Sequence, residues 1–435
     1  MALRNPFSKT IILQLYSNRL IKYLIRSIFI VFIIGVIVLT YRTKRYTTPY
    51  FYIGLELFLI LLLGIIRSKK SPYLRSFFIT LAMITFTLAF CEAYLAGWFS
   101  AKVDAKGIHM YRFEGTYVTN SKNYWKYNKI LGYAGGKNIS VTATKYYRDK
   151  VVYDVTYTDN RYGLRITPHD IMTFPGAGHN PYGNVVFFGC SFMVGQGVND
   201  NETLPYQFEK LSGESFRAYN YGFHGYAPHQ MLRILETGLI DKTISDKKIS
   251  IAICEILTNH VERSSGKYPY IIWDVNGPKY VLNHNGEPEY VGSFGDNIRF
   301  QIVHILNSIF AKSYLLEQTN IRTELFYEKR EPKDISLFIS IIKRSKELFE
   351  QKYNGHFIVL LWRLPGDEDY ATILSKLQEN HIDVVTTDEI FQGETLAEKY
   401  LIKNDDHPNK LANRKLAEFL LAKIRSAQKY TASQK

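Results

Sequence analysis

One stretch decides the fold of the larger part of the chain, residues 184–192, which read NVVFFGCSF. Its short apolar run is followed at once by glycine and serine, which is typical of a buried strand that ends in a tight turn. Beyond it, the patterns predict strands and helices in alternation. The strands are expected at 216–222, 249–257, 357–362 and 382–387, and the helices at 204–211, 228–240, 335–353, 370–380 and 410–427. This alternation predicts a three-layer α/β domain over 182–435, with a mostly parallel sheet covered on both faces.

Three loops of this domain are expected at one edge of the sheet, because sites in such sheets form beyond the carboxyl ends of the strands. In the loop after the first strand, Gly189 permits a tight turn that exposes the hydroxyl of Ser191 near a helix start. The loop at 220–226 holds glycines that can lend a backbone N–H to an oxyanion. In the loop at 404–409, an acid beside His407 can orient its imidazole.

Each loop alone has a plain structural explanation. Serine often caps helices, glycine shapes turns, and histidines on surfaces commonly lie near acids. A serine, then an aspartate and a histidine late in the chain, all expected at one sheet edge, are much less easily explained in this way. Together they indicate a catalytic constellation.

These loops also resemble the conserved blocks of SGNH/GDSL hydrolases, in the family's order: 189–192 the first block, 220–225 the glycine block and 405–409 the closing block. The resemblance implies a flavodoxin-like α/β domain in which Ser191 is the nucleophile, His407 takes its proton and Asp405 orients His407. It further implies an oxyanion site made by the backbone N–H of Ser191, a glycine N–H and a loop asparagine. The glycine would be Gly225, with Gly222 as the second choice, and the asparagine Asn259.

The chain departs from the family pattern at three positions. Cys190 stands where the family has an aspartate before the nucleophile, and Leu257 replaces the glycine of the third block. The family's acid lies three residues before the histidine, a position that Asn404 occupies here. The acid is therefore Asp405 or Asp406, and reach favours Asp405. Close to Asn259, both His260 and Arg263 could contact an anionic substrate or hold their loop.

The first hundred residues contain three apolar runs, at 24–41, 50–66 and 77–98. Each is near the ~20 residues that a helix needs to cross a bilayer core of ~30 Å. The first is too long for a cleaved signal peptide and two more follow it, so 1–100 predicts an anchor of three transmembrane helices. Basic residues of the N-terminal segment and of 67–75 favour a cytoplasmic N-terminus. The rest of the chain would then be extracytoplasmic, and periplasmic in a Gram-negative cell.

Residues 101–181 predict a small β-rich lead-in between anchor and α/β domain. The alternation at 151–158 should place Val151, Tyr153, Val155 and Tyr157 on one face. The stretch Val155-Thr156-Tyr157-Thr158, followed by Tyr162-Gly163-Leu164-Arg165, is similar to a lead-in of membrane-anchored SGNH/GDSL members. A turn-rich stretch at 175–183 ends this subdomain.

The net charge of +14 does not indicate a nucleic-acid partner, because much of the excess flanks the apolar runs, where topology signals belong. The three cysteines fit no zinc or haem motif, and the histidines lack ligand spacing with acids or cysteines. We therefore expect neither a metal nor a cofactor.

The leading interpretation is an extracytoplasmic serine esterase or O-acyltransferase that acts on acyl esters, such as acetyl esters, of a cell-envelope polysaccharide. The substrate class comes by analogy with membrane-tethered relatives. A transferase would need an acyl donor, handed over by a multi-span protein of the same membrane. The alternative is a non-catalytic envelope module that binds a glycan or a partner protein. The departures at Cys190 and Leu257 favour this alternative, whereas Ser191, Asp405 and His407 together favour catalysis.

Overall fold

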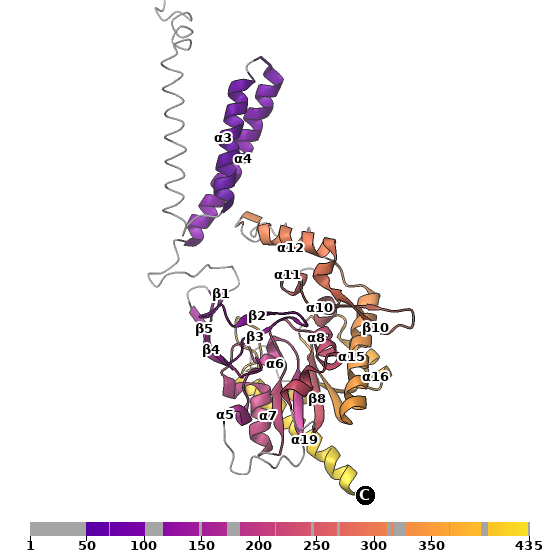
Figure 1. Ribbon diagram of the computed structural model, residues 1–435. Coiled ribbons are helices and arrows are strands. Elements are labelled where there is room, and N and C mark those ends of the chain that lie inside the picture. Colours follow the sequence, from indigo (N-terminus) through magenta and orange to yellow (C-terminus); the bar gives the residue numbers. More distant parts are fainter. Residues whose placement is uncertain are drawn as a thin grey trace, which may run out of the picture. The chain divides into compact units, whose positions relative to one another are not determined.

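The computed structural model (Figure 1) describes residues 49–68, 70–100, 116–147, 150–171, 183–213, 215–244, 248–267, 270–310, 313, 315–316, 328–364, 366–392 and 399–433. The chain forms two compact units. One comprises Met1–Met110 and Ile309–Asn320, and the other Tyr111–Ser308 and Ile321–Lys435. The second unit holds both the predicted lead-in and the α/β domain.

A five-stranded parallel sheet forms the centre of the α/β domain, in the order β12-β11-β8-β6-β7. Counted along the chain, this is the order 2-1-3-4-5 of flavodoxin-like folds, read from β7 to β12. The strands are β6 (Asn184–Phe188), β7 (Arg217–Asn220), β8 (Ile249–Ile256), β11 (His356–Leu361) and β12 (Asp383–Thr386). The predicted α/β class and parallel sheet are confirmed. The order reverses between β6 and β8, so the carboxyl ends of these two strands flank the crevice where ligands bind in such sheets.

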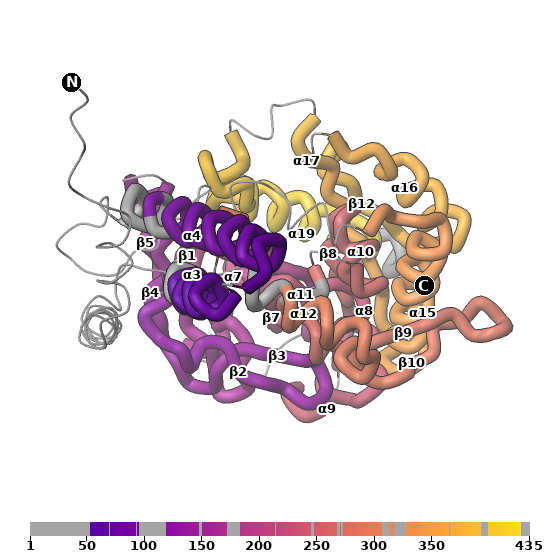
Figure 2. The backbone as a smooth tube through the Cα atoms, turned by 90° about the horizontal axis from the view of Figure 1, so that it is seen from above, coloured from indigo at the N-terminus to yellow at the C-terminus, as the bar shows by residue number. Residues whose placement is uncertain are grey.

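Alternate residues of the strands pack into two separate hydrophobic cores. Val186 and Phe188 of β6 belong to the core under α8 (Pro228–Glu236), α15 (Pro332–Tyr353) and α16 (Tyr370–Glu379), of which Figure 2 shows α15 and α16 side by side. Val185 and Phe187 belong to the core under α7 (Leu204–Ser212) and α19 (Lys410–Ser433). Burying each phenylalanine contributes about 2 kcal/mol. Both faces of the sheet are thus covered, as the unbroken apolar strands predict.

One predicted helix is divided in the structure. The helix expected over 228–240 ends as α8 at Glu236, and α9 (Leu239–Thr243) begins after Gly238. Gly238 has a φ of 64°, in the left-handed region that glycine tolerates, and it turns the chain between the two helices. The other helices and strands expected between 204 and 427 form within a few residues of their predicted limits.

The lead-in is β-rich, as predicted. Antiparallel strands β1 (Thr116–Thr119), β4 (Ile139–Tyr147) and β5 (Lys150–Asp159) form one sheet, and Figure 2 shows the hairpin of β2 (Trp125–Asn128) and β3 (Gly132–Gly135). On β5, Tyr153, Val155 and Tyr157 are buried as the alternation predicts, but Val151 is 55% exposed. The prediction is wrong for Val151, which pairs with β4 just beyond a register shift after Lys145.

The remaining described elements are shorter or peripheral. They are α5 (Pro168–Ile171), α6 (Ser191–Val194), α10 (His260–Ser265), α11 (Ile271–Asp274), β9 (Pro278–Leu282), β10 (Pro288–Ser293), α12 (Ile298–Phe310) and α17 (Thr387–Phe391), with one-turn 3-10 helices at Asp200–Glu202 and Phe294–Asp296.

The first unit contains two long helices, α3 (Pro49–Arg67) and α4 (Pro72–Ser100). Within the described residues, one stretch, Pro72–Glu92 of α4, is long and apolar enough to cross a membrane. The predicted span at 50–66 forms α3, and the span at 24–41 lies outside the described residues. Glu92 is buried and accepts hydrogen bonds from the Ser313 hydroxyl (2.9 Å) and the Leu315 N–H (3.0 Å). This carboxyl therefore has a structural partner inside its own unit.

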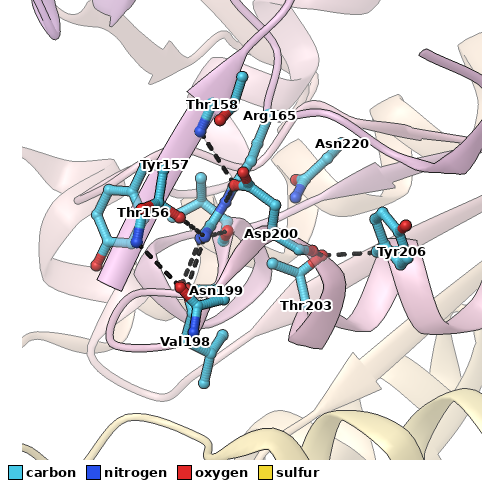
Figure 3. Close-up of polar contacts among 12 residues, drawn as sticks. Thr156, Tyr157, Thr158, Arg165, Val198, Asn199, Asp200, Thr203, Tyr206 and Asn220 are labelled. Atoms are coloured by element: carbon cyan, nitrogen blue, oxygen red, sulfur yellow. Dashed lines mark hydrogen bonds and ion pairs between the residues drawn. The ribbon is translucent and has the colours of Figure 1, made fainter. Parts of the chain in front are cut away.

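Arg165, from the segment that resembles the lead-in of membrane-anchored relatives, joins β5 to the loop after α6 (Figure 3). Its Nε donates to Asp200 (2.9 Å), and its Nη atoms donate to the carbonyls of Val194 (2.7 Å) and Val198 (2.7 Å), among others. Its guanidinium lies 4.3 Å from the ring centroid of Tyr157. The side chain is fully buried. Arg165 therefore fixes the carboxyl end of the helix that begins with Ser191.

Replacing this arginine should destabilise the fold. Arg165→Gln removes a buried charge and leaves Asp200 and several carbonyls without their donor, which should cost about 3–5 kcal/mol. Thermal unfolding of the detergent-solubilised chain measures this as a lower Tm. Arg161→Gln is the matched control, because Arg161 is exposed, and it should change stability by less than about 0.5 kcal/mol. Equal Tm values for the two variants would contradict this role of Arg165.

Candidate active site

The structure brings Ser191, His407 and Asp405 into one hydrogen-bonded chain. Ser191 is the first residue of α6, directly after β6, and His407 lies in the loop before α19. The Nε2 atom of His407 lies 2.8 Å from the Ser191 hydroxyl, and its Nδ1 lies 2.7 Å from Asp405 Oδ2. With the proton on Nδ1, the imidazole donates to Asp405 and accepts the proton of the serine, which is the arrangement a general base requires.

Asp405, rather than Asp406, faces the histidine. The Asp405 side chain is fully buried and its second oxygen, Oδ1, forms an ion pair with Lys145 of β4. Asp406 is exposed, with a φ of 63°. Burial alone would raise the pKa of Asp405, but the hydrogen bond with His407 and the ion pair with Lys145 outweigh it and hold the pKa below its usual value. Sequence reasoning missed Lys145, which stands 260 residues before its partner.

The two candidate oxyanion glycines have different surroundings. The Gly222 N–H donates to the Asn220 side chain (3.0 Å), whereas Gly225 lines a cavity together with Ser191 and Asn259. Gly225 has a φ of 75°, and a Cβ there would lie 2.7 Å from the indole nitrogen of Trp273. Glycine is therefore required at 225 by backbone conformation and by space. The geometry favours Gly225 as the glycine that faces a reacting carbonyl.

The cavity over Ser191 has a volume of about 510 Å³. Its walls include the half-exposed rings of Trp125 and Trp273, and its complete lining is Trp125, Cys190, Ser191, Phe192, Gln196, His224, Gly225, Leu257, Asn259, Arg263, Trp273, Leu364, Asp405, Asp406 and His407. Burial, followed by the charge of His407, lowers the pKa of His224 to about 3. His224 is therefore neutral, and contacts Tyr124 Oη (2.9 Å) and Gln196 Oε1 (2.8 Å).

A buried carboxyl on β8, Glu255, supports the loop that carries Ser191. The Cys190 N–H donates to Glu255 Oε2 (3.2 Å), and a Cβ at Gly189 would lie 2.2 Å from the same oxygen. Glycine is thus required at position 189 by the approach of Glu255. The loop before Ser191 holds Cys190, and a carboxyl from the neighbouring strand lies beside it.

Burial sets the ionisation of this pair. It raises the pKa of Glu255 to about 8 and, with the charge of Glu255, raises that of the Cys190 thiol to about 12. A thiol with such a pKa has almost no thiolate at neutral pH, so Cys190 is a poor nucleophile. The hydroxyl of Ser191, in contrast, lies 2.8 Å from the Nε2 atom of His407.

Of the two residues predicted as possible substrate contacts, His260 and Arg263, one lines the cavity and the other does not. His260 is fully buried, accepts the Leu257 N–H at its Nδ1 (3.4 Å) and does not line the cavity. Arg263, one turn further along α10, does line it. Within the described residues, no three histidine, cysteine, aspartate or glutamate side chains are grouped as metal ligands would be.

Comparison with known proteins gives no matching family model and no matching curated protein. Solved structures do match. The chain is similar to lipolytic proteins of the G-D-S-L family. A member from Veillonella parvula is 14% identical (TM-score 0.32), and the alignment covers 54% of this chain and 94% of that one.

Two further solved structures show the same degree of likeness. A psychrotrophic esterase from a Pseudoalteromonas species is 11% identical (TM-score 0.30; 57% of this chain, 98% of that one). A carbohydrate acetylesterase family member from Sinorhizobium meliloti is 10% identical (TM-score 0.29; 56% and 97%).

The buried carboxyl of Glu255 should make the free energy of unfolding depend on pH. Its carboxyl has a pKa of about 8 when folded and an ordinary value of 4.5, so the folded state holds an extra proton between these values. The free energy of unfolding should therefore fall as the pH rises from 4.5 to 8, by at most about 1.4 kcal/mol per pH unit. The amide of Glu255→Gln cannot titrate, so the Tm of this variant should fall less over the same range.

The measurement is the Tm of the detergent-solubilised protein at a series of pH values across this window. Glu418→Gln serves as the control, because Glu418 is an exposed carboxylate of α19, and it should follow the wild type. Parallel curves for wild type and Glu255→Gln would show that the Glu255 carboxyl does not bind this proton.

Proposed function

We propose that this chain is a serine esterase or O-acyltransferase of the SGNH/GDSL type. The observation that carries the proposal is the chain of contacts from Ser191 through His407 to Asp405. In this mechanism, the Ser191 oxygen attacks an ester carbonyl while His407 takes its proton, and Asp405 stabilises the resulting imidazolium. His407 then protonates the departing alcohol. Water or a sugar hydroxyl, deprotonated by His407, releases the acyl group from Ser191.

The negative charge of the tetrahedral intermediate requires donors that are fixed beforehand. We assign this role to the N–H groups of Ser191 and Gly225, with the side chain of Asn259, which lines the same cavity. Gly222, whose N–H is bonded to Asn220, is not part of this assignment.

The proposed substrate is an acyl ester, such as an acetyl ester, of a cell-envelope polysaccharide. Two half-exposed tryptophans, Trp125 and Trp273, line the cavity beside the nucleophile. Aromatic rings with one open face suit the apolar faces of sugar rings, while the cavity volume of about 510 Å³ is that of a small-molecule site.

The proposed location is the outer side of a membrane, periplasmic in a Gram-negative cell, with three N-terminal spans and a cytoplasmic N-terminus. The apolar stretch Pro72–Glu92 supports anchoring, and the basic residues before the first run and between the last two runs support the orientation. For the transferase, the acyl donor would come from a multi-span membrane protein. Acyl transfer to added sugar acceptor, rather than release of free acid, would distinguish the transferase from the esterase.

A serine-reactive fluorophosphonate should label the detergent-solubilised chain, because His407 activates the Ser191 oxygen for attack on phosphorus. Ser191→Ala and His407→Ala should both abolish labelling. Cys190→Ala should keep it, as should His356→Ala, which removes an exposed histidine. Absence of labelling in a demonstrably folded wild type would favour the non-catalytic glycan- or partner-binding module.

Lys145 should act as a positioning residue for Asp405. Lys145→Met removes the ion pair on Asp405 Oδ1, so the carboxylate loses a fixed orientation and its pKa should rise toward its usual value. We expect kcat for p-nitrophenyl acetate to fall about tenfold, which corresponds to ~1.4 kcal/mol of barrier, and the acidic limb of the pH–rate profile to move to higher pH.

The control is Lys126→Met, which removes an exposed lysine that contacts Asn123 in the same lead-in. It should leave both the rate and the profile unchanged. An unaltered pH–rate profile in Lys145→Met would contradict the assigned role even if the rate fell.

A further inference from the structure

The cavity over Ser191 contains one cation whose role the proposed mechanism leaves open. Arg263 belongs to α10 (His260–Ser265), which follows β8, and it lines the same cavity as Ser191 and His407. Its Nη1 donates to the carbonyl of Tyr226 (3.3 Å), and its guanidinium lies 5.4 Å from the ring centroid of Tyr270. Neutral groups therefore hold the guanidinium in place without neutralising its charge.

Within the described residues, no carboxylate pairs with Arg263. The adjacent acid of α10, Glu262, instead binds Arg330 through both of its oxygens (2.8 and 2.9 Å). The Nε of Arg263 is buried and has no hydrogen-bond partner in the described part of the chain. A partly desolvated guanidinium without an anion is unfavourable, and an anionic ligand in the cavity would compensate its positive charge.

The other charged groups of the cavity are already accounted for. Asp405 is paired with Lys145 and hydrogen-bonded to His407, and burial keeps the nearby Glu255 mostly protonated at neutral pH. Asp406 is exposed, so solvent screens its charge. Among the described residues that line the cavity, Asp406 aside, Arg263 carries the charge that no ion pair compensates.

The type of anion follows from this charge. A planar guanidinium matches a carboxylate in a two-point contact. A phosphate dianion would call for a second cation, and Arg263 is the sole arginine or lysine among the described residues that line the cavity. A monoanionic carboxylate is therefore the best match.

The cavity also fixes where a sugar ring would lie. Trp125 comes from the hairpin of the lead-in and Trp273 from α11, and both rings are half-exposed in the cavity. Next to Trp273, Asp274 is buried and accepts hydrogen bonds from Gln230 (2.8 Å) and from His229 (2.8 Å). These bonds hold α11, so the indole of Trp273 is positioned before a ligand arrives.

We infer that the substrate is an acidic sugar, with its ring against Trp125 or Trp273 and its carboxylate bound by Arg263. This inference rests on the proposed function, because it takes the cavity over Ser191 to be the substrate site. The proposed substrate is then an envelope polysaccharide that contains uronic acids or sugars with carboxylate-bearing substituents.

Binding to the full-length, detergent-solubilised Ser191→Ala variant tests this without any turnover. The probes are cellotetraose and the tetramer of β-1,4-linked glucuronic acid, which has the same linkage but carries carboxylates. The acidic tetramer should bind at least about tenfold more tightly, and its affinity should fall as the salt is raised from about 20 mM to about 300 mM. Trp125 and Trp273 allow the titration to be followed by fluorescence and checked by calorimetry.

Variants in the same Ser191→Ala background test whether Arg263 causes the tighter binding of the acidic tetramer. Adding Arg263→Gln should abolish the preference for the acidic tetramer, and adding Arg263→Lys should retain part of it. Adding Arg414→Gln, which removes an exposed arginine of α19 outside the cavity, should leave the preference intact. Equal binding of the two tetramers, binding of neither, or a preference that survives Arg263→Gln would overturn the inference.

The two proposals can fail separately. Fluorophosphonate labelling of Ser191 together with equal binding of the tetramers would leave the esterase standing and refute the acidic sugar. Binding that depends on Arg263, without labelling of Ser191, would refute catalysis and support a module that binds acidic glycans.

Discussion

The contact between the Ser191 hydroxyl and His407 Nε2 is the constraint on which the site depends. It joins residues 216 positions apart, one at the carboxyl end of β6 and the other before α19. A histidine can accept the serine proton only if its ring is held in one orientation. Here, Asp405 fixes Nδ1 and the ring of Phe192 packs against the imidazole at 5.2 Å. The parallel sheet and the helices on its two faces hold these two chain segments at contact distance.

The lead-in is part of the site rather than a spacer before it. Lys145 of β4 neutralises Asp405, and Trp125 of β2 forms a wall of the cavity. Arg165 binds the carbonyls at the end of the short helix that begins with Ser191. The α/β domain alone would therefore hold Ser191 and His407, but Asp405 would lose its cation and the cavity one of its aromatic walls. The ion pair at Asp405 is buried, so removing its cation leaves an uncompensated charge, which is the costly case for such pairs.

The parts of this arrangement that the sequence predicts are local. An apolar strand that ends in Gly–X–Ser, and an Asp–His loop before the last helix, indicate the sheet and the positions of Ser191 and His407, because such features follow from a few adjacent residues. The missed features depend on pairings across the fold. Lys145 reads as one basic residue among 54 lysines and arginines, and Glu255 as an interruption of an apolar strand. Neither the use of the Gly222 N–H by Asn220 nor the burial of His260 is visible before the chain is folded.

Two buried carboxyls in this site have opposite ionisation for a physical reason. Asp405 has a cation and a histidine within hydrogen-bond reach, so its pKa lies below the usual value, whereas Glu255 contacts a backbone N–H and a thiol, and burial raises its pKa to about 8. The ionised carboxylate is thus the one that can stabilise a charged imidazole, and the protonated one holds the nucleophile loop without adding negative charge. This division also explains why Arg263 keeps its charge available. A permanently ionised Glu255 would act on the guanidinium and weaken its attraction for an anion, whereas a mostly neutral Glu255 leaves the charge of Arg263 available for the acidic ligand that we propose.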